Sequence, residues 1–599
     1  MTVPILPICK QLSSTKEDSS MRIIDYFNYL ALIIYIAVVS FFLLKKTEST
    51  QKSKLATGRI SLNSGQEKII VCLLLGLGIF LRFFRLSSMP EGFQQDEASN
   101  AYEAFALSFY GMDRNGYLRP VYPITWGSGG GSPFLIYLCA LVIRIFGNSI
   151  LTFRSVVALF GVCTLFLFYF YVKKVHNPTT ALIGLGALAV CPWHVILSRW
   201  LLDCNTIPFW VILVLLLFWK ANTSKKTLHY LIAAAVSGFC LYCYGSATVV
   251  IPLFLLFTCS YSLYVKRLTL KQLFLSGIAF LVITAPLAVF YLINLFDLPA
   301  INTEYFSIPR FVGDHTGSVF IAFDSSLPVT LFSNLIRVLK MLTVGTTDEA
   351  INYVPGYFTF YHFTFPVTFL GLYLALKDMF SGNRKKAWNR HSPMVWMFMA
   401  AFLFSLFIDP NINRMIFIFL PVVYFFAVGT EAIYRKLRYA FVLLVLLFSL
   451  GAISFTRDYF TRFNETTASL CMKGYGNAIQ YAESVRKEGQ TIYSTYEGLA
   501  SPFISALYFS ETAPQDFVDT VIYKDPEAEF LVASSFTHYV FGLPDDLWED
   551  EAASWDNPQL NLNYQDSILI IAQSEKEQFV SEQYRIIDFD YYAVVEYIH

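Results

Sequence analysis

Charged residues are scarce in this chain of 599 residues, because Asp, Glu, Lys and Arg make up only 15% of it. Soluble domains average about 25% charged residues, so an ordinary soluble enzyme is excluded. Intrinsic disorder is excluded as well, because 55% of the residues are hydrophobic and 17% are aromatic, and such a composition does not stay unfolded. What remains is a protein whose apolar residues gather into runs long enough to cross a membrane.

Positive charge is scarce toward the end of the chain. Residues 457–599 contain 24 acidic and 8 basic residues, although the whole chain has 44 of each. A basic, apolar body is therefore followed by an acidic tail, and no large basic surface remains for nucleic acid. The tail contains a single cysteine, Cys471, so no disulfide framework is expected there.

Twelve apolar runs predict membrane helices. The runs are 27–44, 68–86, 153–172, 179–197, 207–219, 228–244, 248–264, 273–293, 357–376, 394–408, 415–434 and 440–456. The first is not interpreted as a cleaved signal peptide, because Lys45 and Lys46 follow it in place of a small-residue cleavage site. A further run, 133–148, contains Arg144 and ends near Gly147, which favours an interfacial or re-entrant helix.

Lysine and arginine cluster in every second loop between these runs. They lie in segments 45–68, 173–174, 220–226, 266–271, 377–390 and 435–438. Basic short loops stay on the cytoplasmic side of a membrane, so these loops are expected to be cytoplasmic. The alternation then places the acidic tail on the outer face of the plasma membrane, together with segments 87–152, 198–206, 294–356 and 409–414.

The expected fold is an α-helical polytopic membrane protein of 11–12 transmembrane helices with a small C-terminal α/β domain. Residues 1–67 contain one extra span and a basic cytoplasmic loop. Residues 68–456 form the transmembrane domain, with a first outer loop and a large outer loop, and residues 457–599 form the acidic extracytoplasmic domain. This tail mixes a helix-like stretch, 478–487, with strand-like ones such as 567–572.

The sharpest cluster of charged residues is Asp96-Glu97, at the start of a predicted amphipathic helix over 96–109. Charged residues near a membrane face are costly and tend to be functional. Two adjacent carboxylates fit a general base with its partner, or a pair of metal ligands. They also fit a helix N-terminus, where acidic residues are stabilised by capping and by the macrodipole, and spacing alone favours this second interpretation.

Stretch 90–160 resembles the first outer loop of type-C (GT-C) glycosyltransferases, in the superfamily of protein O-mannosyltransferases and aminoarabinose transferases (glycosyltransferase family 39-like). Two later segments are similar to the same families: the loop 198–203, and the segment 413–415 that opens a late helix. The residues that match in the first loop are Pro90, Phe93, Asp96, Glu97, Tyr102, Ala104, Gly111, Asp113, Gly116, Pro120, Ser132, Pro133, Phe134, Ile145, Phe146, Gly147, Phe153, Arg154, Ser155 and Gly161.

The resemblance implies the GT-C fold and the transfer of a sugar from a polyprenyl-phosphate donor to an acceptor hydroxyl, with inversion. It implies that Asp96 is the catalytic base and that Glu97 supports it or pairs with an arginine. The leaving phosphate needs cationic donors, for which the planar guanidinium of arginine is well suited. The candidates are three arginines at the outer ends of spans, Arg154, Arg199 and Arg414. Each of them alone is equally well explained as an interfacial residue whose charged end extends to the membrane surface.

Three further residues are assigned to the substrates. Asp203 is expected to hold Arg199 or to bind sugar hydroxyls. The alternative, that it is simply an acidic residue of a solvated loop, is favoured equally. Trp126, in the glycine-rich turn 126–132, is a candidate platform for a sugar ring. Tyr102 is a candidate sugar contact, but a core position is favoured for it.

The sequence departs from these relatives in three places. Gly131 and Ser132 stand where the lipid A transferases carry a basic residue before a proline, so lipid A is a less favoured acceptor. Segment 294–356 is too short for the β-trefoil of eukaryotic O-mannosyltransferases, and the acidic tail has no recognised counterpart. The acceptor is therefore an unidentified envelope protein, polymer or glycolipid, which the tail is expected to help select. No cofactor is certain, but Asp96, Glu97 and Asp203 have the oxygen ligands that Mg²⁺ or Mn²⁺ prefers.

Two other classes of protein remain open. A transporter or flippase of lipid-linked sugars is disfavoured, because no inverted repeat is visible and few ionisable residues lie in mid-membrane, where coupling sites are found. A membrane scaffold for the acidic outer domain is the third class, and it predicts that changing Asp96 has no effect.

Overall fold

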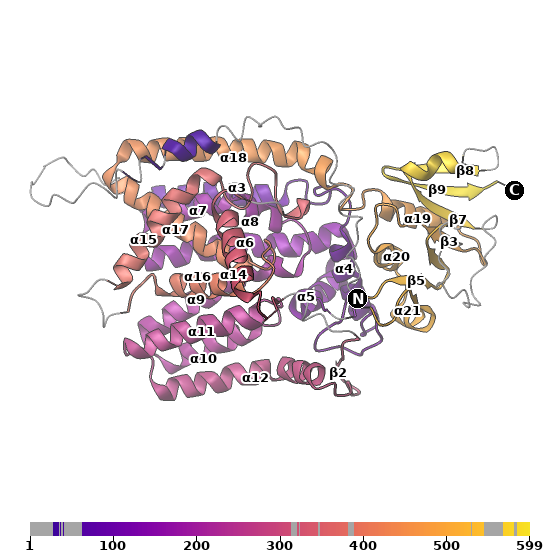
Figure 1. The fold of residues 1–599 in the computed structure, drawn as a ribbon, viewed down its shortest axis with the longest axis horizontal. Helices are drawn as coiled ribbons and strands as arrows, with labels where there is room; N and C mark the ends of the chain where they lie inside the picture. Colours follow the sequence, from indigo (N-terminus) through magenta and orange to yellow (C-terminus); the bar gives the residue numbers. More distant parts are fainter. Residues whose placement is uncertain are drawn as a thin grey trace, which may run out of the picture.

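The computed structural model describes most of the chain beyond residue 62. The described residues are 28–34, 36–37, 40, 63–127, 129–312, 320–322, 324–345, 348–380, 388–528, 530–543, 567–579 and 584–598. Most of the predicted segment 1–67 lies outside them, as do 8 of the 18 residues of the first predicted span, 27–44. The elements keep the labels of Figure 1.

Long apolar helices make up the body of the protein. In the described part of the chain, eight helical segments are long and apolar enough to cross a membrane. They are α3 (Ser64–Phe83), α6 (Ile150–Val175), η2 with α9 (Asp203–Thr206 and Ile207–Ser224), α11 (Ala247–Tyr264), α12 (Leu270–Leu295), η4 with α15 (His362–Thr364 and Phe365–Phe380), α17 (Ile416–Lys436) and α18 (Arg438–Thr467). In Figure 1 they lie side by side along the long axis of the molecule.

Shorter helices complete the body. They are α4 (Gln95–Phe109), α5 (Pro133–Phe146), α7 (Pro178–Ala189), α8 (Pro192–Leu197), α10 (Thr227–Cys240), α14 (Leu327–Thr343), η3 (Ala350–Asn352) and α16 (Ser392–Leu406). Each of the eleven predicted runs from residue 68 onward contains a helix, which confirms the polytopic helical fold. The run 133–148 is helix α5, whose 14 residues extend about 21 Å and so fall short of a hydrocarbon core of about 30 Å.

Helix α17 lies at the centre of the helical body, and nearly all of its residues are buried. Two glycines let it approach α15 closely. A Cβ atom on Gly371 would overlap the backbone of Phe425, and one on Gly429 would overlap the backbone of Val367. This contact packs the middle and the C-terminal half of α17 against α15, and the segment 409–415 precedes the N-terminal end of α17.

The C-terminal domain, which we name the outer domain after its expected location, contains in its described residues a mixed sheet of seven strands in the order β4-β5-β6-β3-β7-β9-β8. Central β3 pairs in parallel with β6 and β7, and the other pairs are antiparallel. The strands are β3 (Ile492–Ser494), β4 (Ile522–Tyr523), β5 (Ala533–Phe536), β6 (Tyr539–Phe541), β7 (Ile568–Ala572), β8 (Tyr584–Phe589) and β9 (Tyr592–Tyr597), with helices α19 (Tyr475–Val485), α20 (Pro502–Phe509) and α21 (Pro514–Thr520). The predicted α/β character of the tail is confirmed.

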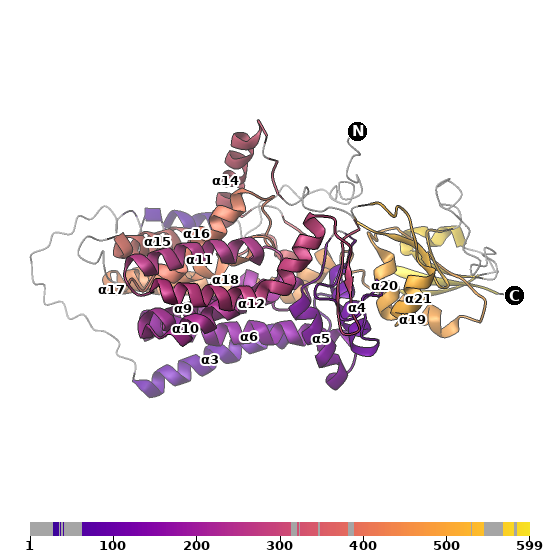
Figure 2. The same ribbon diagram turned by 90° about the horizontal axis from the view of Figure 1, so that it is seen from below.

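Helix α18 joins the two parts, because it continues without a break past the predicted boundary at residue 456 to Thr467. Helices α4 and α5 lie between the long helices and the outer domain (Figures 1 and 2). The buried side chains of α4 and α20 belong to a single hydrophobic core, in which Tyr102 and Phe105 lie with Phe503 and Leu507. The outer domain therefore shares its core with the helix that starts at the Asp96-Glu97 pair.

Candidate functional site

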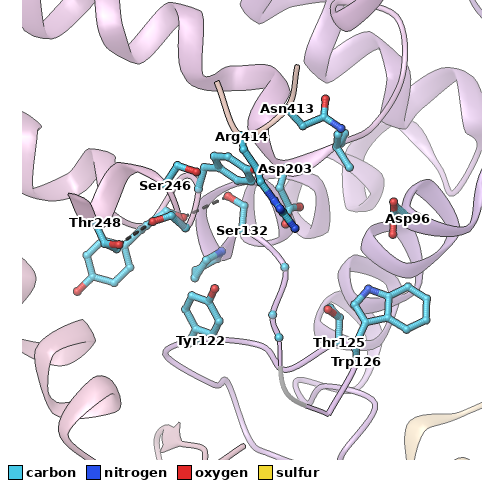
Figure 3. A pocket seen from close by; sticks show the side chains of 18 of the residues that line it. Asp96, Tyr122, Thr125, Trp126, Ser132, Asp203, Ser246, Thr248, Asn413 and Arg414 are labelled. Atoms are coloured by element: carbon cyan, nitrogen blue, oxygen red, sulfur yellow. Dashed lines mark hydrogen bonds between the residues drawn. The ribbon is translucent and has the colours of Figure 1, made fainter. Parts of the chain in front are cut away.

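A cavity of about 470 Å³ opens between the first outer loop, the loop that joins α10 to α11, and the segment before α17. Figure 3 shows it from close by. Four of the eight residues predicted from the sequence line it: Asp96, Trp126, Asp203 and Arg414. They come from four separate segments, so the fold brings together residues that are more than 300 positions apart.

Asp96 lies in the cavity wall at the first turn of α4. The helix begins here because the Gln94 side chain accepts a hydrogen bond from the Asp96 amide (2.5 Å) and Glu97 accepts one from the Gln94 amide (3.3 Å). This arrangement is a capping box. The pKa of Asp96 is raised to about 6, first by burial and then by the negative charge of Asp203. A carboxylate that is still charged at pH 7 but readily takes a proton is suited to general base catalysis.

Asp203, in the first turn of η2, lies in the same cavity. The Ser132 amide and the Asn100 side chain lie beside its carboxylate. Its buried Oδ1 atom has no hydrogen-bond partner in the described part of the chain. A buried acceptor without a partner is costly, and a substrate hydroxyl would satisfy it.

Arg414 extends from the segment before α17 toward the middle of the cavity (Figure 3). Its Nη1 atom donates to the backbone oxygen of Asp409 (3.2 Å) and lies 3.7 Å from the Asp409 carboxylate. Among the described residues, no group accepts a hydrogen bond from its Nε or Nη2 atom, and 24% of its side chain is exposed. The guanidinium therefore retains donors for an anion.

Aromatic side chains form much of the remaining wall, which includes Tyr122, Trp126, Tyr244 and Tyr291. The Trp126 indole packs edge-to-face on Phe503 of the outer domain, with ring centroids 6.5 Å apart. Apolar walls with a few convergent polar groups are typical of small-molecule sites, and flat aromatic faces suit the apolar side of a sugar ring.

The expectation that Arg154 holds a phosphate is corrected by the structure. Arg154 is fully buried and pairs through two contacts with Glu97, Nε to Oε1 at 2.9 Å and Nη2 to Oε2 at 2.7 Å. Its other donors bind the backbone oxygens of Pro90 (2.7 Å) and Gly92 (2.8 Å). Glu97 also accepts the Leu201 amide at 2.9 Å. This pair therefore ties α4, α6 and the loop 198–203 together, and Glu97 takes the arginine-pairing role that was one of its two predicted roles.

Arg199 is corrected in the same way. Its guanidinium is fully buried and donates to the Tyr459 hydroxyl (3.0 Å) and to the backbone oxygens of Leu81 and Phe84 (both 2.8 Å). It closes the C-terminal end of α3 against α18 and does not reach the cavity, so Asp203 does not hold it either. Tyr102 is a core residue, as favoured, whose hydroxyl donates to the Thr512 backbone oxygen at 2.9 Å.

Glu349, which is not part of the cavity lining but interacts electrostatically with Asp96, was not predicted from the sequence. The neighbouring Asp348 accepts the Ile412 amide (2.9 Å), which holds this part of the large outer loop against the segment that carries Arg414. The pKa of Glu349 is raised to about 7, first by loss of water around the carboxyl group and then by the charge of Asp96. The signal was a second adjacent acid pair, Asp348-Glu349, in a segment predicted to lie on the same face as Asp96.

The described residues contain no group of three or more His, Cys, Asp or Glu side chains that are arranged to hold a metal ion. Asp96, Glu97 and Asp203, which have oxygen ligands that suit Mg²⁺ or Mn²⁺, are therefore not grouped as a metal site in this part of the chain.

Comparison with known proteins identifies the fold. Residues 130–290 match the family model described as dolichyl-phosphate-mannose-protein mannosyltransferase. The apo crystal structure of ArnT from Cupriavidus metallidurans is similar to the chain with a TM-score of 0.54 and 13% identity, over 88% of this chain and 98% of that one. The structure of the same protein bound to undecaprenyl phosphate has a TM-score of 0.52 and 13% identity, over 89% and 98%. No curated protein matches the sequence.

This chain therefore has the fold of the type-C glycosyltransferases, and the resemblance inferred from the outer-loop motifs is confirmed. The match to ArnT covers 88% of this chain, which is more than residues 1–456 alone could supply. Part of the outer domain is therefore included in the match. The acidic tail, for which the sequence offered no recognised counterpart, is therefore matched at least in part by that structure.

Proposed function

We propose that this protein is an inverting glycosyltransferase that moves a sugar from a polyprenyl-phosphate donor to an acceptor hydroxyl at the outer face of the plasma membrane. The observation that carries the proposal is the single cavity that contains a carboxylate with a raised pKa, an arginine with unused donors and an aromatic wall. The family model that matches residues 130–290 describes a transferase of dolichyl-phosphate-linked mannose, and a structure of similar fold contains undecaprenyl phosphate.

The proposed reaction is a single displacement. The Asp96 carboxylate takes the proton from the acceptor hydroxyl, and the acceptor oxygen attacks the anomeric carbon of the donor. The bond from that carbon to the phosphate oxygen breaks, and polyprenyl phosphate leaves with the electron pair. Arg414 stabilises the negative charge that develops on the phosphate, because a charged donor in a partly enclosed site acts more strongly than it does in water.

Asp203 and the aromatic wall are assigned to the transferred sugar. The partnerless Oδ1 of Asp203 accepts a sugar hydroxyl, and Trp126 packs on the ring. Which sugar fits is set by these contacts.

The charge pattern supports the outer face as the side of reaction. The cavity is lined by segments 87–152, 198–206 and 409–414, which alternate along the chain with the basic loops that are expected to be cytoplasmic. A polyprenyl-phosphate sugar in the outer leaflet presents its phosphate at this depth.

Activity is expected to fall in acid. Asp96 must be unprotonated to act as a base, and its pKa is raised to about 6 by burial and by Asp203. The value of kcat/KM should therefore be constant above about pH 7 and fall about tenfold for each pH unit below the pKa. The Asp203→Asn variant removes the neighbouring negative charge, so its pH profile should shift to lower pH, whatever its absolute rate. A profile with the same midpoint in both proteins would contradict this assignment.

Arg414→Gln is expected to weaken donor binding without unfolding the protein. A hydrogen bond to a charged group contributes roughly 1.5–3 kcal/mol, so the KM for the donor should rise by about 10- to 100-fold. The matched control is Arg337→Gln, because Arg337 also pairs with Asp409 (2.5 Å) but does not line the cavity. Equal KM values in the two variants would remove Arg414 from the phosphate site.

The proposal is tested by incubating the purified full-length protein with a panel of polyprenyl-phosphate sugars and an envelope extract as acceptor. Release of free polyprenyl phosphate is measured for each donor. Release from at least one donor supports glycosyl transfer. If none is released by the folded protein, the glycosyltransferase proposal fails, and a transporter or scaffold takes its place.

A further inference from the structure

The outer domain reaches the cavity at Phe530. Among the described residues that line the cavity, Phe530 is the one that comes from beyond residue 456. It lies in the connection between β4 and β5, and 47% of its surface is exposed. The cavity wall is therefore completed by a part of the chain that lies outside the helical body.

Backbone contacts fix Phe530 to the glycine-rich turn. The Leu531 amide donates to the Trp126 oxygen (3.1 Å), and Gly127 forms an isolated antiparallel bridge with Phe530. On the other side, the Val312 amide donates to the Gly127 oxygen (2.8 Å). Three segments distant in the sequence thus meet at one edge of the cavity, and we name this edge the rim: residues 126–127, 311–312 and 530–531.

The rim requires glycine at position 127. Gly127 has a φ of +87°, which a side chain disfavours. A Cβ atom there would lie 2.7 Å from Cγ of Leu531. Close approach of the outer domain therefore depends on this glycine, and the approach holds Trp126 in the cavity wall, against Phe503 of α20.

We propose that the rim is the acceptor-binding edge of the cavity and that Phe530 is a specificity-determining residue for the acceptor. This inference rests on the proposed glycosyl transfer. The polyprenyl chain of the donor stays in the bilayer, so the donor enters from the side of the long helices. The outer domain lies at the opposite end of the molecule (Figure 1), which is the side open to an acceptor that arrives from the water.

The chemistry of the rim indicates the kind of acceptor. Trp126, Phe311 and Phe530 all line the cavity there, and none of the three carries a charge. Aromatic side chains contribute large contact areas at low cost in conformational entropy. The rim therefore suits an acceptor that presents a sugar ring or another apolar face beside its reacting hydroxyl.

The test measures acceptor and donor dependence separately in the full-length protein. Phe530→Ala, Phe530→Leu and wild type are assayed with the donor that wild type uses, while the amount of envelope extract is varied. Tyr591→Ala is the matched control, because Tyr591 is an exposed aromatic residue of the same domain (45%) that does not line the cavity. Gly127→Ala tests whether the close approach of Leu531 to the glycine-rich turn is needed, because a Cβ atom at position 127 would displace Leu531.

We expect Phe530→Ala to raise the half-saturating amount of acceptor about fivefold or more, with the donor KM changed less than twofold. Phe530→Leu should recover part of the loss, and Tyr591→Ala should match wild type. Gly127→Ala should raise the half-saturating amount of acceptor and the donor KM together, because it displaces Trp126, which is assigned to the donor sugar, as well as the segment that carries Phe530. An unchanged acceptor dependence in Phe530→Ala would overturn the inference, as would an equal rise in the donor KM. If wild type itself releases no polyprenyl phosphate, the proposed function has failed first, and the two failures are thereby distinguished.

Discussion

Asp96→Asn is expected to lower the rate of sugar transfer by about 10²–10⁴-fold, which is the usual contribution of a positioned general base. Asparagine has nearly the same shape, and the Gln94 side chain still caps the Asp96 amide, so α4 should start at the same residue. The melting temperature should therefore stay close to that of wild type. The readout is release of polyprenyl phosphate under single-turnover conditions.

The control for this prediction is Asp297→Asn. Asp297 is an acid of the large outer loop whose side chain is 82% exposed and pairs with Arg310 at the surface. Exposed ion pairs contribute little to stability, so this variant should behave as wild type. A folded Asp96→Asn protein that retains full activity would remove Asp96 from the mechanism and favour the scaffold.

The second large effect is expected on stability. Glu97→Gln leaves the fully buried guanidinium of Arg154 without its counter-ion, and breaking a buried ion pair in this way costs about 3–5 kcal/mol. The protein should lose much of its thermal stability, and activity should fall with it, since the pair links α4 to α6 and to the loop 198–203. Thermal unfolding in detergent, monitored by circular dichroism, measures the change.

A double variant separates this structural role from catalysis. Glu97→Gln combined with Arg154→Met removes both buried charges, so no uncompensated charge is left inside the protein. The double variant should therefore be more stable than Glu97→Gln alone and recover activity in proportion. A stable single variant without activity would instead mean that Glu97 takes part in the chemistry.

The helices were predictable because hydropathy acts over a whole span. A run of about 20 apolar residues has few alternatives to a membrane helix, and the basic loops then order the spans. The positions of Asp96, Asp203 and Arg414 at the ends of such spans followed from the same alternation, and the structure brings them together in one cavity.

The assignments of Arg154 and Arg199 failed for a physical reason. Both lie near the outer ends of spans, where a guanidinium finds either a ligand or the unpaired backbone oxygens at a helix terminus. Sequence position does not distinguish these partners. Arg199 binds the oxygens at the end of α3, and this contact joins residues more than 100 positions apart.

The contribution of the outer domain to the cavity wall could not be predicted from sequence patterns either. Trp126 was singled out from its glycine-rich turn, but Leu531 and Phe530, which fix that turn, lie about 400 residues later. They belong to a strand connection with no motif of its own. Only the folded chain shows that residues beyond the last span shape the cavity.

The most direct test of the account follows the configuration of the transferred sugar. Wild-type protein is given a polyprenyl-phosphate sugar of known anomeric configuration, and the linkage in the glycosylated product is determined by NMR. A single displacement with Asp96 as base predicts the inverted configuration at the anomeric carbon in every product. Retention of the donor configuration would contradict the mechanism, because it requires a second displacement that no part of the account supplies.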